Sequence, residues 1–165
     1  MKVRQLFLSD KKAFDILLCE VESSLLHQEY WLPIDNISKQ HFFDKEWTIL
    51  YGAFINSHLV GVVGLFLNQH EYEESTKQLN LASEKVVELG RLMVHPKYRG
   101  KGISKILVTH AIKNCPDCNI LLATVHPDNV PSKQALLSCG FTYEKTYTKS
   151  CGYVRDIVIQ NVGMV

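Results

Sequence analysis

The sequence predicts one domain of mixed architecture, in the α/β or the α+β class. Its 165 residues suit one ordinary domain. Hydrophobic residues make up 46% of the chain, which is enough for a buried core and excludes a mainly disordered protein. In the second half of the chain, runs typical of strands alternate with runs typical of helices. We therefore expect residues 1–165 to form a single domain built on a sheet.

The chain is expected to begin with a strand over residues 2–8. A helix should follow over 11–27, with Asp10 as its N-cap, because apolar residues recur there at helical spacing. These apolar residues are Phe14, Leu17, Leu18, Val21 and Leu25. Residues 28–46 are irregular and rich in aromatic side chains, and we expect a short helix over 37–43 within them.

Residues 49–67 approach the length of a membrane span. Polar residues at 56–58 interrupt this run in its middle, and the flanks are rich in β-branched and aromatic residues. Two strands over 47–55 and 59–68, joined by a tight polar turn, are therefore predicted in place of a membrane helix. No membrane partner is expected.

The polar residues 69–84 are interpreted as a loop or insertion. Beyond them, apolar runs of strand length alternate with amphipathic runs of helix length. Gly140 marks the end of the last helix. The expected elements are strands over 85–94 and 119–126, helices over 102–114 and 130–138, and closing strands over 141–149 and 153–160.

The formal net charge of +1 hides an uneven distribution of charge. Residues 1–88 carry a net charge of −5, whereas residues 89–116 carry six basic groups and no acidic group. A nearly neutral chain does not predict a nucleic acid as its partner. The local excess of positive charge indicates either a solvated helix face or a site for a small anion.

The cysteines and the N-terminus favour the cytoplasm. The apolar run at residues 6–8 is too short for a signal peptide, and five cysteines show no spacing of a disulfide framework. Cys115 and Cys118 form a CPDC sequence, but there is no second pair to complete a zinc site, so no metal is predicted. Two exposed thiols at a turn are the favoured interpretation, with a redox pair as the alternative.

The most informative stretch is ELGRLMVHPKYRGKGISKIL, residues 88–107. A strand is expected to end at Val94, and a turn over 99–104 to open a helix. Gly100 and Gly102 allow a positive φ and a close approach of a ligand to the backbone. The first N–H groups of a helix lack internal partners and can bind phosphate oxygens. The spacing fits neither a P-loop nor GxGxxG, and we interpret the turn as a pyrophosphate cradle.

Two patterns give the chain a resemblance to a known family. Residues that match Arg/Gln-x-x-Gly-x-Gly/Ala, with serine at the last place, are Arg99, Gly102 and Ser104. Residues that match a second pattern, in HPDNVPSKQALLSCGF, are Asn129, Ser132, Gly140 and Phe141. On these residues the chain resembles the GNAT superfamily of acetyl-CoA-dependent N-acyltransferases over residues 47–160. The resemblance implies a GNAT-type fold with a central mixed, mostly antiparallel sheet of about six to seven strands and about four flanking helices.

The resemblance also implies that acetyl-CoA, the acetyl thioester of coenzyme A, is the cosubstrate. No metal is expected to take part. The pyrophosphate of acetyl-CoA would bind to the backbone of Arg99, Gly100, Lys101, Gly102, Ile103 and Ser104. Its pantetheine arm would pair with the strand backbone of Leu92, Met93 and Val94. The N–H near Val94 would donate to the thioester oxygen as negative charge develops there. The second pattern adds Asn129 and Ser132 to the cosubstrate site.

A general base is needed because a protonated amine cannot attack a thioester. Glu88 is the candidate, since members of the family often carry a base Glu on this strand, and Glu84 is the runner-up. The alternative is that Glu88 is an edge carboxylate paired with Arg91 or Lys85.

The usual general acid of the family is missing, because Leu136 stands where many members have Tyr. A thiolate with an ordinary pKa of about 8.5 can leave without a strong acid. Cys139, Tyr143 and Tyr98 are the other candidates for this role.

The predicted function is transfer of the acetyl group of acetyl-CoA to a primary amine by direct attack in a ternary complex. Two alternatives are an acyltransferase that uses a longer acyl-CoA or acyl carrier protein, and a non-catalytic CoA-binding module. The acceptor could be a small molecule or a peptide, and a homodimer is one possible assembly of the chain. Candidate acceptor-site residues are Tyr30, Trp31, His41 and Phe43. The acidic N-terminal region would suit a cationic amine.

Overall fold

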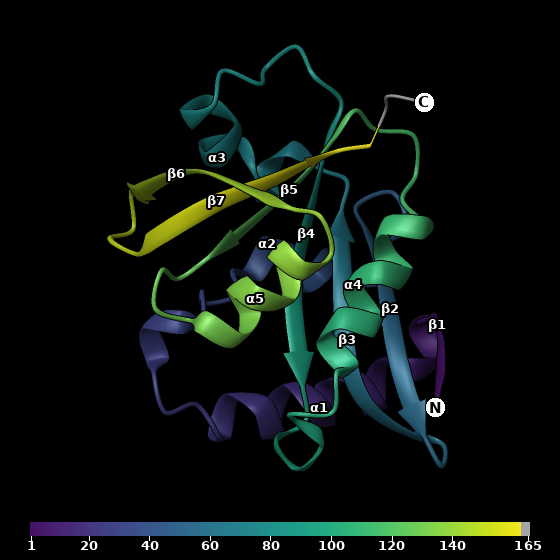
Figure 1. The fold of residues 1–165 in the computed structure, drawn as a ribbon. Coiled ribbons are helices and arrows are strands. Elements are labelled where there is room, and N and C mark those ends of the chain that lie inside the picture. Colours follow the sequence, from purple (N-terminus) through teal and green to yellow (C-terminus); the bar gives the residue numbers. More distant parts are fainter. Residues whose placement is uncertain (163–165) are drawn as a thin grey trace.

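All strands of the described chain join in one sheet (Figure 1). The computed structural model describes residues 1–162. The strands are β1 (Lys2–Gln5), β2 (Thr48–Ile55), β3 (His58–Phe66), β4 (Val86–Val94), β5 (Ile120–Val125), β6 (Thr142–Thr148) and β7 (Val154–Asn161). Their spatial order is β1-β2-β3-β4-β5-β7-β6, and only β4 and β5 run parallel to each other. The mixed, mostly antiparallel sheet implied by the family resemblance is therefore confirmed.

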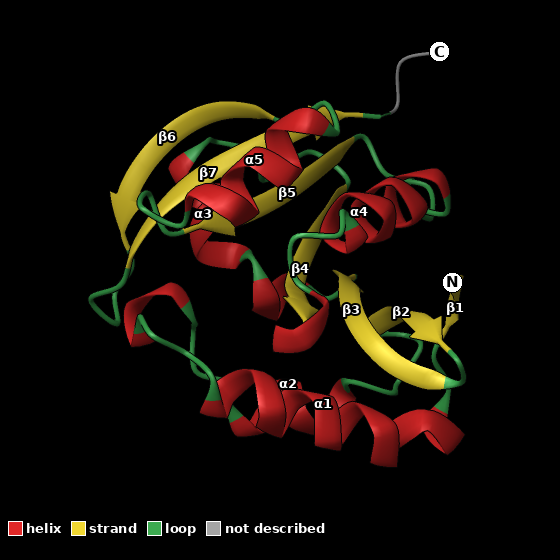
Figure 2. Ribbon diagram, turned by 60° about the horizontal axis from the view of Figure 1, so that its bottom comes forward, coloured by secondary structure: helices red, strands yellow, loops and turns green. Residues whose placement is uncertain are grey.

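Helices cover both faces of this sheet (Figure 2). Those found within residues 1–162 are α1 (Lys11–Ser23), α2 (Asn36–His41), α3 (Glu73–Gln78), α4 (Ile103–Lys113) and α5 (Val130–Ser138). Helices α1 and α2 lie on one face, and α4 and α5 lie on the other. A sheet that is covered on both faces buries its central strands, which explains why β3 and β5 are apolar almost throughout.

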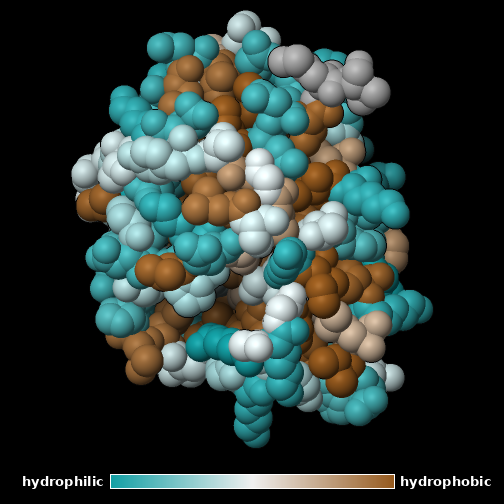
Figure 3. Space-filling view, viewed as in Figure 1, coloured by the Kyte–Doolittle hydropathy of each residue, from teal (hydrophilic) through white to brown (hydrophobic). Residues whose placement is uncertain are grey.

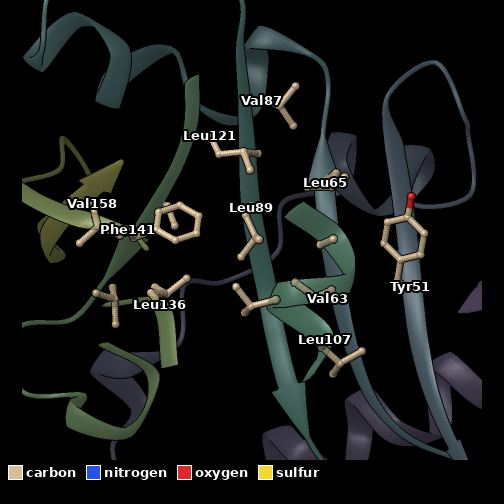
Figure 4. Close-up of a cluster of buried hydrophobic side chains, with 14 of the residues drawn as sticks. Tyr51, Val63, Leu65, Val87, Leu89, Leu107, Leu121, Leu136, Phe141 and Val158 are labelled. Atoms are coloured by element: carbon tan, nitrogen blue, oxygen red, sulfur yellow. The ribbon is translucent and has the colours of Figure 1, made fainter. Parts of the chain in front are cut away.

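The core is divided by the sheet because side chains alternate between the two faces of each strand. On the α4 and α5 face, Leu89 and Leu121 pack with Leu107 of α4 and Leu136 of α5 (Figure 4). On the α1 face, Phe14, Leu17 and Val21 of α1 pack against residues of β2, β3 and β4. A third cluster joins Tyr72, beside α3, to β4, β5 and β7. On β4, β5 and β7, the residues of this third cluster alternate with those that face α4 and α5. They therefore point to the opposite face of the sheet, and α3 lies on the same face as α1.

Strands β4 and β5 form the only parallel pair among residues 1–162, and their ladder is the shortest in the sheet. Strands β4 and β5 are in register over three pairs, which end at Glu88 and Leu122. Beyond this point the ladder stops, although β4 continues to Val94 and β5 to Val125. The two strands therefore leave a gap at the centre of the sheet, and this gap positions the site described below.

The interpretation of residues 69–84 as a loop is wrong. Helix α3 lies within them, which makes five helices in the described chain instead of about four. Its acidic first turn suits a helix N-terminus, and Ser75 Oγ hydrogen-bonds to Tyr147 Oη at 2.8 Å. Tertiary contacts thus stabilise a helix that lacks an apolar stripe, and periodicity could not reveal it.

Other differences concern the ends of elements. The first strand ends at Gln5 instead of residue 8, and α1 ends at Ser23 instead of residue 27. Asp10 is the N-cap residue of α1, as predicted, but its side chain makes no capping hydrogen bond, because its carboxylate accepts hydrogen bonds from Arg4 and from the Phe7 N–H. The arginine holds the pKa of Asp10 down to about 2.

The strands predicted at 47–55 and 59–68 form the hairpin of β2 and β3, with Asn56 and Ser57 in its turn at positive φ. None of the helices within residues 1–162 combines the length and the apolar character needed to cross a membrane. On the face seen in Figure 3, apolar side chains reach the surface in several separate groups between polar ones.

Candidate active site

The edge of β4 that faces β5 has unpaired backbone groups beyond the short parallel ladder. The N–H of His95 donates to Val60 O of β3 at 2.8 Å. Because backbone groups of a strand alternate in direction, those of Leu92 and Val94 point the other way, into the gap. From that side Arg99 Nε donates to Val94 O at 3.1 Å. The N–H groups of Leu92 and Val94 are thus free to bind a ligand.

A bulge in β4 places Arg91 where it holds residues 31–32, which line the cavity between β4 and β5. The register of β4 against β3 shifts between Val62 and Gly64, which leaves an extra residue in β4, and Arg91 has a φ of 50°. The Arg91 guanidinium donates to Leu32 O at 2.5 Å and lies 5.4 Å from the centre of the Trp31 ring. Arg91 therefore ties residues 31–32 to β4.

The turn before α4 presents free N–H groups to the solvent. Gly100 and Gly102 have φ of 76° and 75°, and Gly102 is the N-cap of α4. Within the described residues, the backbone N–H groups of 100–105 have no hydrogen-bond partner, and Ile106 N–H makes the first bond, to Gly102 O. A Cβ at either glycine would meet nothing within 4 Å. The turn is an open array of donors suited to an anion.

A groove of about 770 Å³ leads from this turn along β4 to the start of α5. All predicted cosubstrate residues except Lys101 line it, and they are Leu92, Met93, Val94, Arg99, Gly100, Gly102, Ile103, Ser104, Asn129 and Ser132. The Lys101 ammonium instead lies 5.1 Å from the centre of the Tyr98 ring. The end of α1 contributes to the opposite wall, where Ser24 Oγ accepts a hydrogen bond from Arg99 Nη2. These residues fit a cosubstrate with phosphates at one end and an extended amide-bearing chain.

Glu88 lines a smaller cavity of about 150 Å³ at the gap between β4 and β5. Burial raises the pKa of Glu88 to about 8, and the nearby charge of Lys149 opposes this rise. The alternative pairing of Glu88 with Arg91 or Lys85 is not formed, because Lys85 pairs with Asp117 at 2.8 Å and Arg91 bonds to backbone carbonyls. Glu88 is therefore a half-buried carboxyl group that faces a cavity without a direct partner among the described side chains.

Glu84, the runner-up for the base, is exposed in the segment before β4 and lines neither the groove nor the cavity. The groove and the cavity meet at one place. Residues that line both are Tyr30, Trp31, Leu92, Asn129 and Ser132. The Tyr30 hydroxyl donates to Asp128 O at 3.1 Å, next to the start of α5.

The place of the missing general acid is apolar. Leu136 is buried in the core and lines the cavity. Tyr98 lines the groove, but beside the anion-binding turn. Cys139 Sγ lies 3.6 Å from Thr109 Oγ1, and the Tyr143 side chain is half exposed. Neither residue lines the groove or the cavity.

Two of the four aromatic candidates for the acceptor site lie elsewhere. Tyr30 and Trp31 line the cavity. His41 stacks on Trp47 with ring centres 3.8 Å apart, and Phe43 packs edge-on against a core ring of α1.

Sequence reasoning missed three charged residues of the cavity, which are Glu71, Lys149 and Arg155. They come from the segment before α3, from the end of β6 and from β7, and no shared motif links them. The only signal was the pair Arg155 and Asp156 inside the apolar run of the last strand.

The CPDC thiols lie away from this site. Cys115 Sγ and Cys118 Sγ are 3.2 Å apart after the end of α4, and both cysteines are free. The interpretation as two exposed thiols is wrong, because Cys118 is buried in the core and Cys115 is partly buried against it. In the part of the chain that the structure describes, no group of three or more His, Cys, Asp or Glu side chains is arranged to hold a metal ion.

Comparisons with solved structures show which proteins share this fold. The Streptococcus mutans protein smu.2055 is 22% identical, with a TM-score of 0.72 and coverage of 98% of this chain and 99% of that chain. The ribosomal-protein-S18-alanine N-acetyltransferase from Escherichia coli is 14% identical, with a TM-score of 0.71 and coverage of 99% and 95%. Arabidopsis thaliana NAA60, in complex with a bisubstrate analogue, is 16% identical, with a TM-score of 0.69 and coverage of 97% of each chain.

A search among curated protein sequences finds no match. The model of the acetyltransferase (GNAT) family matches residues 11–141, which is more than half of the chain. Members of this family act on amine acceptors. Because the match includes the turn before α4, the gap beside β4 and most of the sheet, the chain belongs to the acetyltransferase (GNAT) family of transferase enzymes.

Proposed function

We propose that the protein transfers the acetyl group of acetyl-CoA to a primary amine by direct attack, with both substrates bound together. The observation that carries this proposal is that the groove beside α4 is continuous with the cavity that Glu88 lines. The groove begins at the free N–H groups of residues 100–105 and joins, beside Leu92, the cavity that Glu88 lines. A phosphate-bearing cosubstrate in the groove and an amine in the cavity would therefore meet at this junction.

The backbone does most of the cosubstrate binding in this proposal. The N–H groups at the start of α4 hold the pyrophosphate, and the charge of Arg99 adds to the helix dipole there. The edge of β4 at Leu92 and Val94, with its free N–H groups, binds the pantetheine arm as an added strand would. The Val94 N–H then donates to the thioester oxygen as negative charge develops on it. Acetyl-CoA, when bound, supplies the activated acetyl group.

Glu88 acts as the general base. The amine nitrogen bonds to the acetyl carbon, the carbon–sulfur bond breaks, the electron pair leaves on sulfur, and the amine proton passes to Glu88. A raised pKa of about 8 makes the Glu88 carboxylate basic enough for this transfer near neutral pH. No side chain at Leu136 protonates the sulfur, and a thiolate with a pKa of about 8.5 leaves unaided.

A screen for release of free coenzyme A tests this function. The full chain is incubated with acetyl-CoA and a library of primary amines that includes small amines, amino acids and peptides. We expect release with at least one class of amine, and a rise in the melting temperature with acetyl-CoA alone. No thermal shift at millimolar acetyl-CoA would contradict the proposal.

Two outcomes of the same screen favour the alternatives. Faster transfer from a longer acyl-CoA or an acyl carrier protein would indicate a different acyl donor. Binding of acetyl-CoA without transfer to any amine would indicate a non-catalytic module, and the absence of a Tyr at Leu136 favours this second candidate.

We further propose that the protein acts in the cytoplasm, without nucleic acid or membrane, and the near-neutral charge and free cysteines support this setting. Light scattering on the purified chain tests whether it forms a homodimer.

A further inference from the structure

Arg155 is a buried cation without an anionic partner in the described chain. It lies on β7, and only 1% of its surface is exposed. Its Nη1 donates to Val154 O at 2.7 Å, whereas its Nη2 has no hydrogen-bond partner within residues 1–162. No described carboxylate forms an ion pair with it. A buried charge of this kind is costly unless something compensates it.

The neighbouring carboxylate does not compensate this charge. Asp156 follows Arg155 on the strand, so its side chain points to the opposite face of the sheet. There it pairs with Lys133 Nζ of α5 and accepts a hydrogen bond from Thr146 Oγ1. Asp156 is thus satisfied on the α5 side, and Arg155 is left on the side of the cavity, which it lines.

The charged residues of the cavity come from two different parts of the fold. Arg155 and Lys149 belong to the hairpin of β6 and β7. The Lys149 side chain is 16% exposed. Its one carboxylate contact within residues 1–162 is a long one of 3.8 Å with Glu74, besides a hydrogen bond to Tyr147 Oη and a position 5.7 Å from the centre of the Tyr147 ring. Glu88 of β4 and Glu71 of the segment before α3 supply the negative charges. The cavity therefore has two cations from the β6–β7 hairpin opposite its carboxylates. A third cation, Arg91 of β4, also lines it, but the Arg91 guanidinium already donates to the carbonyls of residues 32 and 33.

We propose that the amine acceptor is a small, amino-acid-like zwitterion whose carboxylate is bound by Arg155 and Lys149 while its amine faces Glu88. This inference rests on the proposed function. The planar guanidinium suits a carboxylate, because it can donate two parallel hydrogen bonds. A cavity of about 150 Å³ is small beside the usual range of about 300–1,000 Å³ for ligand sites, and this size favours a single small acceptor.

The test compares acceptors that differ only in the carboxylate. A panel of L-amino acids, their amides and the matching amines without the carboxylate is assayed with acetyl-CoA and the full chain. Rates are corrected for the fraction of neutral amine, because an amide lowers the pKa of the neighbouring amine. We expect kcat/KM to be at least about tenfold higher for the acid than for its amide, since a site built to bind a group rejects analogues that lack it.

Substitutions then assign this preference to the cations. Arg155→Met should remove the preference by raising KM for the acid while the amide keeps its rate within about threefold, and R155K should restore part of it. Lys145→Met, at an exposed position on β6 away from the cavity, is the matched control and should change neither rate. The melting temperature and the acetyl-CoA shift of each variant show that the fold and the groove are intact.

Each result decides the proposal. Equal rates for acids and amides, or an equal loss of both in R155M, would overturn the carboxylate site while the acetyltransferase proposal stands. If no amine is acetylated, the proposed function fails, and binding decides the inference. N-acetylated amino acids and their amides are then titrated calorimetrically in the presence of coenzyme A. Tighter binding of the acids that is lost in R155M supports the carboxylate site, and binding without discrimination overturns it.

Discussion

At the scale of single residues, the chemistry of the site depends on burial. Glu88 is an ordinary carboxylic acid whose pKa rises to about 8 because the gap between β4 and β5 removes water from it. Glu84 lies on the exposed segment before the same strand. These two carboxylates, four positions apart, thus differ in exposure, and only Glu88 faces the cavity and suits a base.

Glu88→Gln should reduce kcat/KM by about 10²- to 10⁴-fold, the usual contribution of a general base. In the wild type the rate should rise with pH through the Glu88 pKa of about 8, because only the ionised carboxylate accepts a proton. A pH–rate profile between 6 and 9 measures both effects. Glu84→Gln is the matched control and should behave as the wild type. An unchanged profile in E88Q would show that another group or a water chain is the base.

Glu88→Gln should lower activity but raise the free energy of unfolding at alkaline pH. Between the ordinary glutamate pKa of 4.5 and the folded pKa of about 8, the native protein keeps a proton on Glu88 that the unfolded chain releases. The free energy of unfolding therefore falls as pH rises, by at most about 1.4 kcal/mol per pH unit from this group. E88Q should be more stable than the wild type at pH 8 and similar at pH 4, as denaturant titrations can measure. A constant difference across this range would contradict the raised pKa.

At the scale of elements, the turn before α4 and the bulge of β4 create the binding surfaces. The turn needs residues that accept positive φ, and Gly100 and Gly102 supply them. The bulge places Arg91 at positive φ and connects it to the loop at residues 31–32. Both features use irregular backbone at the ends or edges of regular elements, where N–H and C=O groups are available to ligands.

Gly102→Val should abolish the rise in melting temperature with acetyl-CoA, because the side chain distorts and crowds the donor array at the start of α4. A branched residue at positive φ costs roughly 1–3 kcal/mol by itself. Gly152→Val is the control, since Gly152 also has a positive φ, of 92°, and open space around it, but lies in the turn between β6 and β7. Both variants should lose similar stability, and only G102V should lose the ligand response. Retention of that response in G102V would place the pyrophosphate elsewhere.

Arg91→Met should raise KM for the acceptor with little change in kcat, because the loop that carries Trp31 and lines the cavity loses its attachment to β4. The expected change is about tenfold, as for the loss of a charged hydrogen bond worth about 1.5 kcal/mol. Arg4→Met removes a comparable contact, with Phe54 and Asp10, far from the site, and should leave KM unchanged. Steady-state kinetics on both variants measures the difference. Equal KM values in R91M and R4M would contradict the role of this loop.

At the scale of the whole molecule, the gap between β4 and β5 brings the parts of the site together. The two strands pair over only three residues and then separate, so the groove beside α4 and the cavity beside β7 join at the centre of the sheet. The turn before α4, Glu88 and the cations that line the cavity come from positions 88 to 155 of the chain. Their meeting depends on the strand order, which places β7 next to β5.

Local signals predicted most elements of this fold. The strand and helix runs of the second half lie within two residues of their predicted ends, because apolar periodicity and Gly140 mark them clearly. The short polar helix α3 was missed, since its stability comes from contacts with β6 and not from its own pattern. The loop residues Tyr30 and Trp31 were identified as candidates, but His41 and Phe43 were grouped with them only because they share an aromatic-rich stretch.

The sequence by itself predicted the strand and helix runs of the second half and the glycine turn at residues 99–104, because each depends on residues that are neighbours in the chain. The mixed sheet and the candidate base Glu88 were implied by the family resemblance. Only the tertiary structure decided that Glu88 has a raised pKa, that Leu136 lines the cavity, and that Arg155 is buried beside the cavity with no partner for its Nη2 within residues 1–162. These properties depend on desolvation and on which strands lie side by side. Both arise from contacts between distant parts of the chain, which no local pattern contains.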